Sequence, residues 1–111
     1  IESEVDPIVM KQIKEQVIDA RSADSNTHYQ AAAYFYETNR DAEQALSWVN
    51  KAINQRAEKG YWMVHLQAKL LARLNRKAEA TTSAKESIQL AQMAGNPDYV
   101  RLNEKLIATL N

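Results

Sequence analysis

The sequence predicts an all-α protein in which antiparallel helical hairpins are stacked as a short solenoid of about six helices. Its 111 residues include only two glycines and two prolines against 45% hydrophobic residues, which is typical of helices rather than of sheets with many tight turns. Two stretches also align without a gap at a constant offset, and a fixed period of this length indicates a helical solenoid. The aligned pairs, offset by 35 residues, are Ala33 with Ala68, Tyr36 with Leu71, Ala45 with Ala80, Val49 with Ala84, Ala52 with Ser87, and Ile53 with Ile88.

Composition excludes several classes of partner and chemistry. The 14 basic and 14 acidic residues cancel, so the chain has no general electrostatic attraction for nucleic acid or for an anionic membrane. No apolar run approaches the roughly 20 residues that cross a bilayer, so membrane insertion is not expected. The chain contains no cysteine, which excludes disulfides and thiol catalysis.

The first residues divide into an extended segment and a helix. Residues 1–6 alternate apolar and polar side chains as the end of a half-buried strand would, so we expect them to belong to an upstream domain or a linker. Asp6 followed by Pro7 is a helix start signal, and Met10, Ile13 and Val17 follow at helical spacing. We therefore expect a first helix over 7–21 and a helical domain over 7–111.

Two capping patterns predict the next pair of helices. Thr27 with Gln30 three residues later matches a capping box, which predicts a helix over 28–38. Asp41 with Gln44 repeats the pattern before a helix over 42–56. Gly60 is expected to be the left-handed residue that ends this helix.

The second half of the chain predicts three further helices. Residues 61–74 carry two apolar stripes, so this helix is expected to be covered on two sides. A long helix over 76–94 has a face of small residues that allows a neighbour to approach closely, and Gly95 should end it. Asn96 and Pro97 start a last helix over 97–110. The stripes of the first of these helices are Val64, Ala68 and Leu71, and Met63, Leu66, Leu70 and Leu74; the apolar face of the last is Tyr99, Leu102, Leu106 and Leu110.

The repeated pattern resembles the tetratricopeptide repeat (TPR). The family places a small residue and then an aromatic one on the first helix, and small, apolar and small residues on the second. These places fall on Ala33, Tyr36, Ala45, Val49 and Ala52, and again on Ala68, Leu71, Ala80, Ala84 and Ser87. The usual turn glycine is replaced by Arg40 and Asn75, and no proline closes either repeat. The resemblance implies a right-handed solenoid with repeats at about 27–60 and 61–95 and a capping helix over 97–110.

A second resemblance concerns the amino-acid sequence of two of the expected helices. The stretch Ala-Ala-Ala-Tyr-Phe-Tyr with Glu-Gln-Ala-Leu-Ser-Trp-Val-Asn-Lys-Ala-Ile, within 31–53, is similar to the helical tail of an uncharacterised bacterial family. In that family a β-rich domain, usually behind an export signal, precedes the tail. The resemblance implies a periplasmic or cell-envelope protein of unknown activity.

The TPR resemblance also implies where a partner binds, because such repeats present their first helices on the concave face. Lys69 and Arg73 lie four residues apart on one helix face and both donate to carboxylates, so with His65 they could hold an acidic peptide or a chain terminus. A solvated face is the alternative for this pair of cations. The expected concave-face residues are Gln30, Tyr34, Glu37, Trp62, His65, Lys69 and Arg73.

The two tryptophans are expected in different surroundings, and the sequence carries no pattern typical of a catalytic or metal site. Trp48 is expected in the core, whereas Trp62, at a helix start, is expected either in the core or at an exposed partner site. Neither His28 nor His65 has a second ligand one helical turn away, so no metal site is predicted. No serine has both a glycine-flanked turn and a histidine at a neighbouring helical position, and two glycines cannot build a phosphate-binding loop, so no catalytic group or cofactor is predicted. The sequence thus favours a non-catalytic module that binds a protein or peptide. A structural accessory that packs on its own upstream domain or on a second copy of the chain is the alternative.

Overall fold

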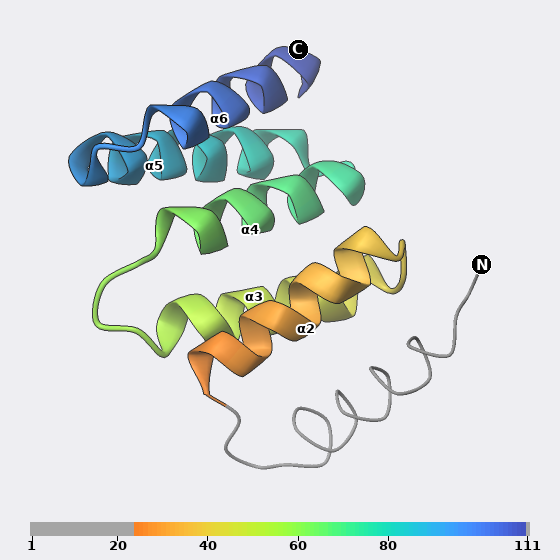
Figure 1. Cartoon of the computed structure of the whole chain (residues 1–111). Coiled ribbons are helices and arrows are strands. Elements are labelled where there is room, and N and C mark those ends of the chain that lie inside the picture. Colours follow the sequence, from red (N-terminus) through yellow and green to blue (C-terminus); the bar gives the residue numbers. More distant parts are fainter. Residues whose placement is uncertain (1–23, 111) are drawn as a thin grey trace.

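The computed structural model describes residues 24–110, and helices are the only regular secondary structure in this part of the chain (Figure 1). It confirms the all-α prediction, with five helices described where about six were expected. The helix expected over 7–21 and the extended segment expected over 1–6 lie outside the described residues. The five helices are α2 (Ser25–Glu37), α3 (Ala42–Asn54), α4 (Tyr61–Arg73), α5 (Lys77–Ala94) and α6 (Pro97–Leu110).

Successive helices run antiparallel to one another, and each packs against the next (Figure 1). The connections between successive helices are short, so each helix packs antiparallel against the next one in the chain. α4 also contacts α2 and α6, so these three helices follow one another on one side of the molecule, while α3 and α5 cover the other side. α4 is therefore the central helix of the described part.

α2 begins three residues earlier than the sequence predicts. The Asp24 carboxylate is its N-cap and accepts a hydrogen bond from the Thr27 amide at 2.8 Å. The predicted cap, Thr27, is therefore wrong, because a carboxylate is the better acceptor for the free amides at a helix start. The hydrogen bonds from Thr27 hold the pKa of Asp24 below its ordinary value.

The start of α3 is confirmed, but the role expected for Gly60 is wrong. Asp41 caps α3 by accepting from the Gln44 amide at 3.1 Å, and the helix ends at Asn54, two residues before the predicted end. Gly60 has extended backbone, with φ −88° and ψ 131°, and is the N-cap of α4. A Cβ atom at this position would lie 2.8 Å from the Trp62 ring, so glycine is needed here for close approach and not for a left-handed turn.

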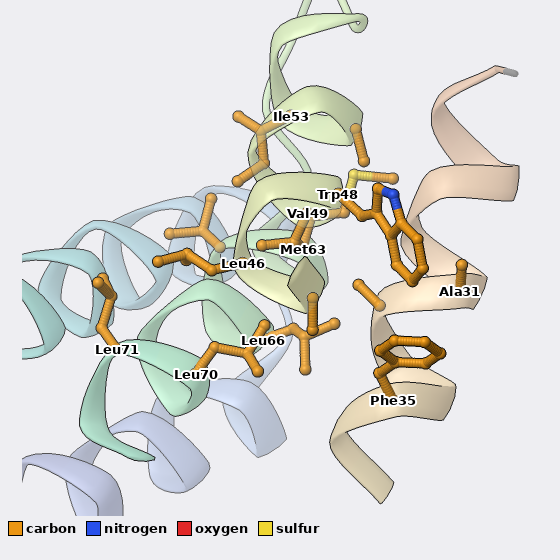
Figure 2. Packing of buried hydrophobic residues seen from close by; sticks show 14 of the residues in the cluster. Ala31, Phe35, Leu46, Trp48, Val49, Ile53, Met63, Leu66, Leu70 and Leu71 are labelled. Atoms are coloured by element: carbon orange, nitrogen blue, oxygen red, sulfur yellow. The ribbon is translucent and has the colours of Figure 1, made fainter. Parts of the chain in front are cut away.

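α4 is covered on two sides, as its two apolar stripes predict. Val64, Ala68 and Leu70 have no exposed surface, and Met63 is 1% exposed. Met63 lies beside Val49 of α3, and Leu66, Leu70 and Leu71 continue the same apolar layer along α4 (Figure 2). This cluster joins α2, α3 and α4 into one core.

The turns within the two hairpins are closed by asparagines in the left-handed conformation. Asn39 has φ 60° and Asn75 has φ 65°. Asparagine is one of the few residues that visit this region at small cost, so it replaces glycine here. In the first turn the left-handed residue is Asn39 and not Arg40, the position expected from the TPR pattern.

Hydrogen bonds at these turns place α2 and α4 in a register one residue different from the predicted one. The Arg40 amide donates to the Phe35 carbonyl, and the Arg76 amide donates to the Leu71 carbonyl. Phe35 and Leu71 are thus equivalent, at an offset of 36 residues. The N-caps of the second helices, Asp41 and Arg76, are 35 residues apart. The first turn therefore contains one residue more than the second.

Burial agrees with the register of the hydrogen bonds. Ala32 and Ala68 are both fully buried, whereas Ala33 is only partly buried. The predicted pairs Ala33 with Ala68 and Tyr36 with Leu71 are accordingly wrong by one residue in α2. In the second helices three of the four predicted pairs hold at full burial: Ala45 with Ala80, Val49 with Ala84, and Ala52 with Ser87. In the fourth pair Ile53 is buried and Ile88 is only partly buried.

The end of α5 and the start of α6 follow the prediction, but the buried face of α6 differs from it. Gly95 is left-handed, with φ 74°, and ends α5. Asn96 then accepts from the amides of Asp98 and Tyr99 at the start of α6. Leu102, expected on the apolar face, is 45% exposed, and the fully buried residue of this helix is the polar Asn103.

Candidate functional site

A small pocket of about 60 Å³ lies where α2, α4 and α6 meet. Its volume suits a few water molecules or the end of one side chain. Its wall combines aromatic rings with one ammonium, one imidazole and one carboxylate. The lining residues are Tyr29, Ala33, Tyr36 and Glu37 of α2, Trp62, His65, Leu66 and Lys69 of α4, and Tyr99 of α6.

The structure brings together some of the residues expected on the concave face. Four of the seven line the pocket: Glu37, Trp62, His65 and Lys69. Arg73 lies one helical turn beyond Lys69 and packs against the same α2 residue. Gln30 is exposed and does not line the pocket, and Tyr34 instead lies 5.5 Å from the Arg40 guanidinium, measured to its ring centroid.

The register of α2 explains which α2 residues reach the pocket. At the observed offset of 36 residues, His65 and Lys69 correspond to Tyr29 and Ala33, both of which line the pocket. The uncorrected offset selects Gln30 and Tyr34 instead. One extra residue in the first turn thus moves the pocket face of α2 by about 100° around the helix axis.

Two cations of α4 share one aromatic ring of α2. The Lys69 Nζ lies 4.6 Å from the Tyr36 ring centroid, and the Arg73 guanidinium carbon lies 3.9 Å from it. Arg73 also donates to the Tyr36 carbonyl at 2.8 Å. Arg73 is therefore held in place by α2, whereas Lys69 keeps its ammonium beside the pocket.

The ammonium of Lys69 has an unusual environment for a lysine. Within residues 24–110, no carboxylate lies within 4.0 Å of its Nζ. Burial lowers the pKa of Lys69, the Glu37 carboxylate opposes this shift and the Arg73 charge adds to it. A half-buried cation without a close counter-ion can donate to an anionic or polar acceptor group.

His65 is the other polar group on the α4 side of the pocket. It is only 7% exposed, and its Nδ1 lies 2.7 Å from the Oδ1 of Asn103, which is fully buried in α6. Burial lowers the pKa of His65, the hydrogen bond with Asn103 opposes this shift, and the Lys69 charge adds to it. The imidazole is therefore favoured in its neutral form at the edge of the pocket.

Aromatic residues that were not predicted complete the wall. The Tyr99 ring packs edge-on against His65, at 5.4 Å between centroids, and against Tyr61 at 4.9 Å. Burial raises the pKa of both Tyr29 and Tyr99, so both hydroxyls stay protonated and can donate or accept. Tyr29, Ala33 and Glu37 lie four residues apart on one face of α2. With the correct register, this spacing alone would have identified them as pocket residues.

The two tryptophans have different surroundings. Trp48 is 3% exposed and packs edge-on against Phe35 at 4.7 Å, so its predicted place in the core is confirmed (Figure 2). Trp62 is partly buried, lines the pocket and lies 5.2 Å from the Arg56 guanidinium, measured to the ring centroid. Of the two, only Trp62 can report on an occupied pocket.

The described part of the chain shows neither a metal-binding cluster nor a membrane-spanning helix. Among the described residues, no three His, Cys, Asp or Glu side chains gather closely enough to hold a metal ion. None of the described helices has the length and apolar character needed to span a membrane. Comparison with protein-family models, with curated proteins and with solved structures gave no match to this chain.

Proposed function

We propose that this chain is a non-catalytic helical-repeat module, arranged as a TPR-like solenoid, that binds an acidic peptide or an acidic segment of another protein. The binding face is formed by α2, α4 and α6. The starts of these helices support the repeat, since Ser25, Tyr61 and Pro97 follow one another at intervals of 36 residues. The equivalent asparagine turns and the equivalent buried alanines support it further.

The observation that carries the proposal is the environment of Lys69. Its ammonium is partly removed from water at the pocket, and no described carboxylate lies within ion-pair distance of it, although the Glu37 charge acts on it from farther away. An oxygen acceptor of the ligand would restore the lost solvation through a charge-assisted hydrogen bond. Arg73, which is oriented by Tyr36, adds positive charge beside it. Rigid aromatic surface from Trp62 and Tyr99 supplies apolar contact area at small entropic cost.

The proposal is tested by calorimetric titration of the chain with a short peptide rich in glutamate and aspartate. Lys69→Gln removes the charge at the pocket, while Lys85→Gln removes one from an exposed site on α5, which does not line the pocket. A charge-assisted hydrogen bond contributes about 1.5 to 3 kcal/mol, so Lys69→Gln should weaken binding about tenfold or more. Lys85→Gln should leave binding unchanged. Equal affinity of both variants, or no binding by the unmodified chain, would contradict the proposal.

A structural accessory that packs on a second copy of the chain is the other candidate, and the surface of α5 and α6 favours it. Met93 is 84% exposed and Leu102 is 45% exposed, which places two large apolar side chains in water. Under this proposal the chain sediments as a dimer, and Met93→Glu together with Leu102→Glu returns it to a monomer. A monomer at all accessible concentrations would remove this candidate.

A further inference from the structure

In the hydrogen-bond network between α4, α5 and α6, two backbone carbonyl groups determine which side chains donate and which accept. The Ser87 hydroxyl lies 2.8 Å from the Tyr61 carbonyl, which only accepts, so Ser87 donates there. Its proton is thereby used, and Ser87 must accept from the Asn103 amide nitrogen at 2.9 Å. The same nitrogen lies 2.8 Å from the Tyr99 carbonyl, which takes the second amide hydrogen. The orientation of the Asn103 amide is thus fixed by two carbonyl groups.

This orientation decides which nitrogen of His65 carries a proton. With both amide hydrogens of Asn103 directed elsewhere, its Oδ1 faces His65 Nδ1 at 2.7 Å. An oxygen with no hydrogen can only accept, so Nδ1 carries the proton and donates. A neutral imidazole has one N–H, which leaves Nε2 as a bare acceptor. Since Nδ1 is bound to Asn103 and the ring lines the pocket, Nε2 is the ring nitrogen left for a ligand.

We propose that Asn103 is a positioning residue that fixes His65 as the Nδ1–H tautomer, so that the pocket presents an acceptor beside the Lys69 donor and selects a carboxamide or hydroxyl group. A carboxamide oxygen accepts from Lys69 while its N–H donates to His65 Nε2. This inference rests on the proposed function and names the group of the peptide that enters the pocket. An asparagine, glutamine, serine or threonine side chain within an acidic peptide carries the required chemistry.

The other groups around the pocket disfavour charged ligand ends. Lys69 and Arg73 repel an ammonium group, and they outnumber the one carboxylate of the pocket, Glu37, which would attract it. A carboxylate can accept from Lys69, but its second oxygen would face the lone pair of His65 Nε2 or the Glu37 carboxylate. The pocket volume of about 60 Å³ also suits the end of a short polar side chain. The carboxylates of the peptide then bind outside the pocket, where Arg73 offers donors.

The tautomer is tested by long-range ¹H–¹⁵N correlation spectra of the ¹⁵N-labelled intact chain at neutral pH. The chain has only two histidines, so a His28→Gln variant assigns both rings. His65 should show a protonated Nδ1 and an unprotonated Nε2, the reverse of the preference of imidazole in water. A protonated Nε2, or a mixture of the two tautomers, overturns the proposal irrespective of whether any peptide binds.

Two variants test whether Asn103 is the cause. Asn103→Leu removes the acceptor, and the Nε2–H tautomer should then be populated; an unchanged Nδ1–H tautomer in this variant overturns the assignment. If Asn103→Leu does not fold, Asn103→Asp provides the second test. Its carboxylate should keep the Nδ1–H tautomer and raise the pH at which His65 titrates. Titration at the same pH as in the unmodified chain would overturn the assignment.

The selected group is tested with acetamide and acetate as probes at equal concentrations. Acetamide should shift the His65 Nε2 resonance, because it donates to this nitrogen, and acetate should shift it less. Lys69→Gln should reduce the acetamide effect, whereas Lys85→Gln should not. An acetate shift as large as that of acetamide, or no shift with acetamide, would overturn the selection of a donor group. Neither outcome affects the calorimetric test, so a failure of this inference can be distinguished from a failure of the proposed peptide binding.

Discussion

The guanidinium of Arg73 lies against the Tyr36 ring at 3.9 Å from its centroid and donates at the same time to the Tyr36 carbonyl at 2.8 Å. One side chain of α4 thus contacts both the ring and the backbone of one α2 residue. The carbonyl belongs to the last turn of α2, where the helix dipole favours a cation. This contact fixes α2 relative to α4 at the edge of the pocket.

Arg73→Met should lower the free energy of unfolding by about 1 kcal/mol, since it removes a charged hydrogen bond and an exposed cation–π contact while keeping an apolar stem. Arg73→Lys should lose less, because it keeps the charge. Urea denaturation measures both effects. Lys85→Met, at an exposed α5 position, is the matched control, and equal stabilities of Arg73→Met and Lys85→Met would rule out a stabilising role for the contact.

Gly60→Ala should disturb Trp62 more than it disturbs the backbone. The added Cβ would lie 2.8 Å from the Trp62 ring, while the extended φ of −88° suits alanine. We expect a loss of about 1 to 3 kcal/mol, typical of overpacking, and altered emission from Trp62 in a Trp48→Phe background. Gly60→Ala with unchanged stability and emission would show that the ring does not pack on this glycine.

The stability of the chain should depend on pH through His65. Its folded pKa lies below the ordinary value of 6.5, so the unfolded state binds more protons as pH falls through 6.5 towards the folded pKa. The His65 contribution is therefore present above about pH 6.5 and is lost below it, with a slope of at most about 1.4 kcal/mol per pH unit. Urea denaturation across this range, compared with His65→Gln, isolates the effect. Parallel profiles for the two chains would contradict it.

Local signals predicted several helix ends correctly because their chemistry is local. Asp41 accepts from an amide three residues away, Gly95 adopts a left-handed conformation, and Pro97 begins a helix. Each of these depends on neighbours in the sequence. Gly60 was misread because its need for glycine comes from the position of the Trp62 ring, which a local pattern does not contain.

The register of α2 could not be read from the sequence because its composition is ambiguous at that point. Three alanines over 31–33 are followed by three aromatic residues over 34–36, so a small residue precedes an aromatic one by three positions in three different registers. Only the turn, with Asn39 left-handed and Arg40 as an extra residue, selects Ala32 and Phe35. The same error affects Gln30 and Tyr34, because the predicted register placed them on the binding face.

The hydrogen-bond network behind His65 could not be predicted for a different reason. Asn103 stands among the apolar residues of α6 and its role depends on Ser87 of α5 and His65 of α4. These three residues are far apart in the sequence and share no motif. Such a network becomes evident only when three helices have been packed, whereas the cationic spacing of Lys69 and Arg73 is local and was found.

The register of α2 is the central claim, because it decides that Ala33 faces the pocket and Ala32 faces the core. The direct measurement is the free energy of unfolding of Ala32→Leu and Ala33→Leu by urea denaturation. Ala32 is fully buried, so its substitution should cost about 1 to 3 kcal/mol through overpacking, while leucine at Ala33 should cost less and partly fill the pocket. A larger loss for Ala33→Leu than for Ala32→Leu would contradict the observed register and the binding face that depends on it.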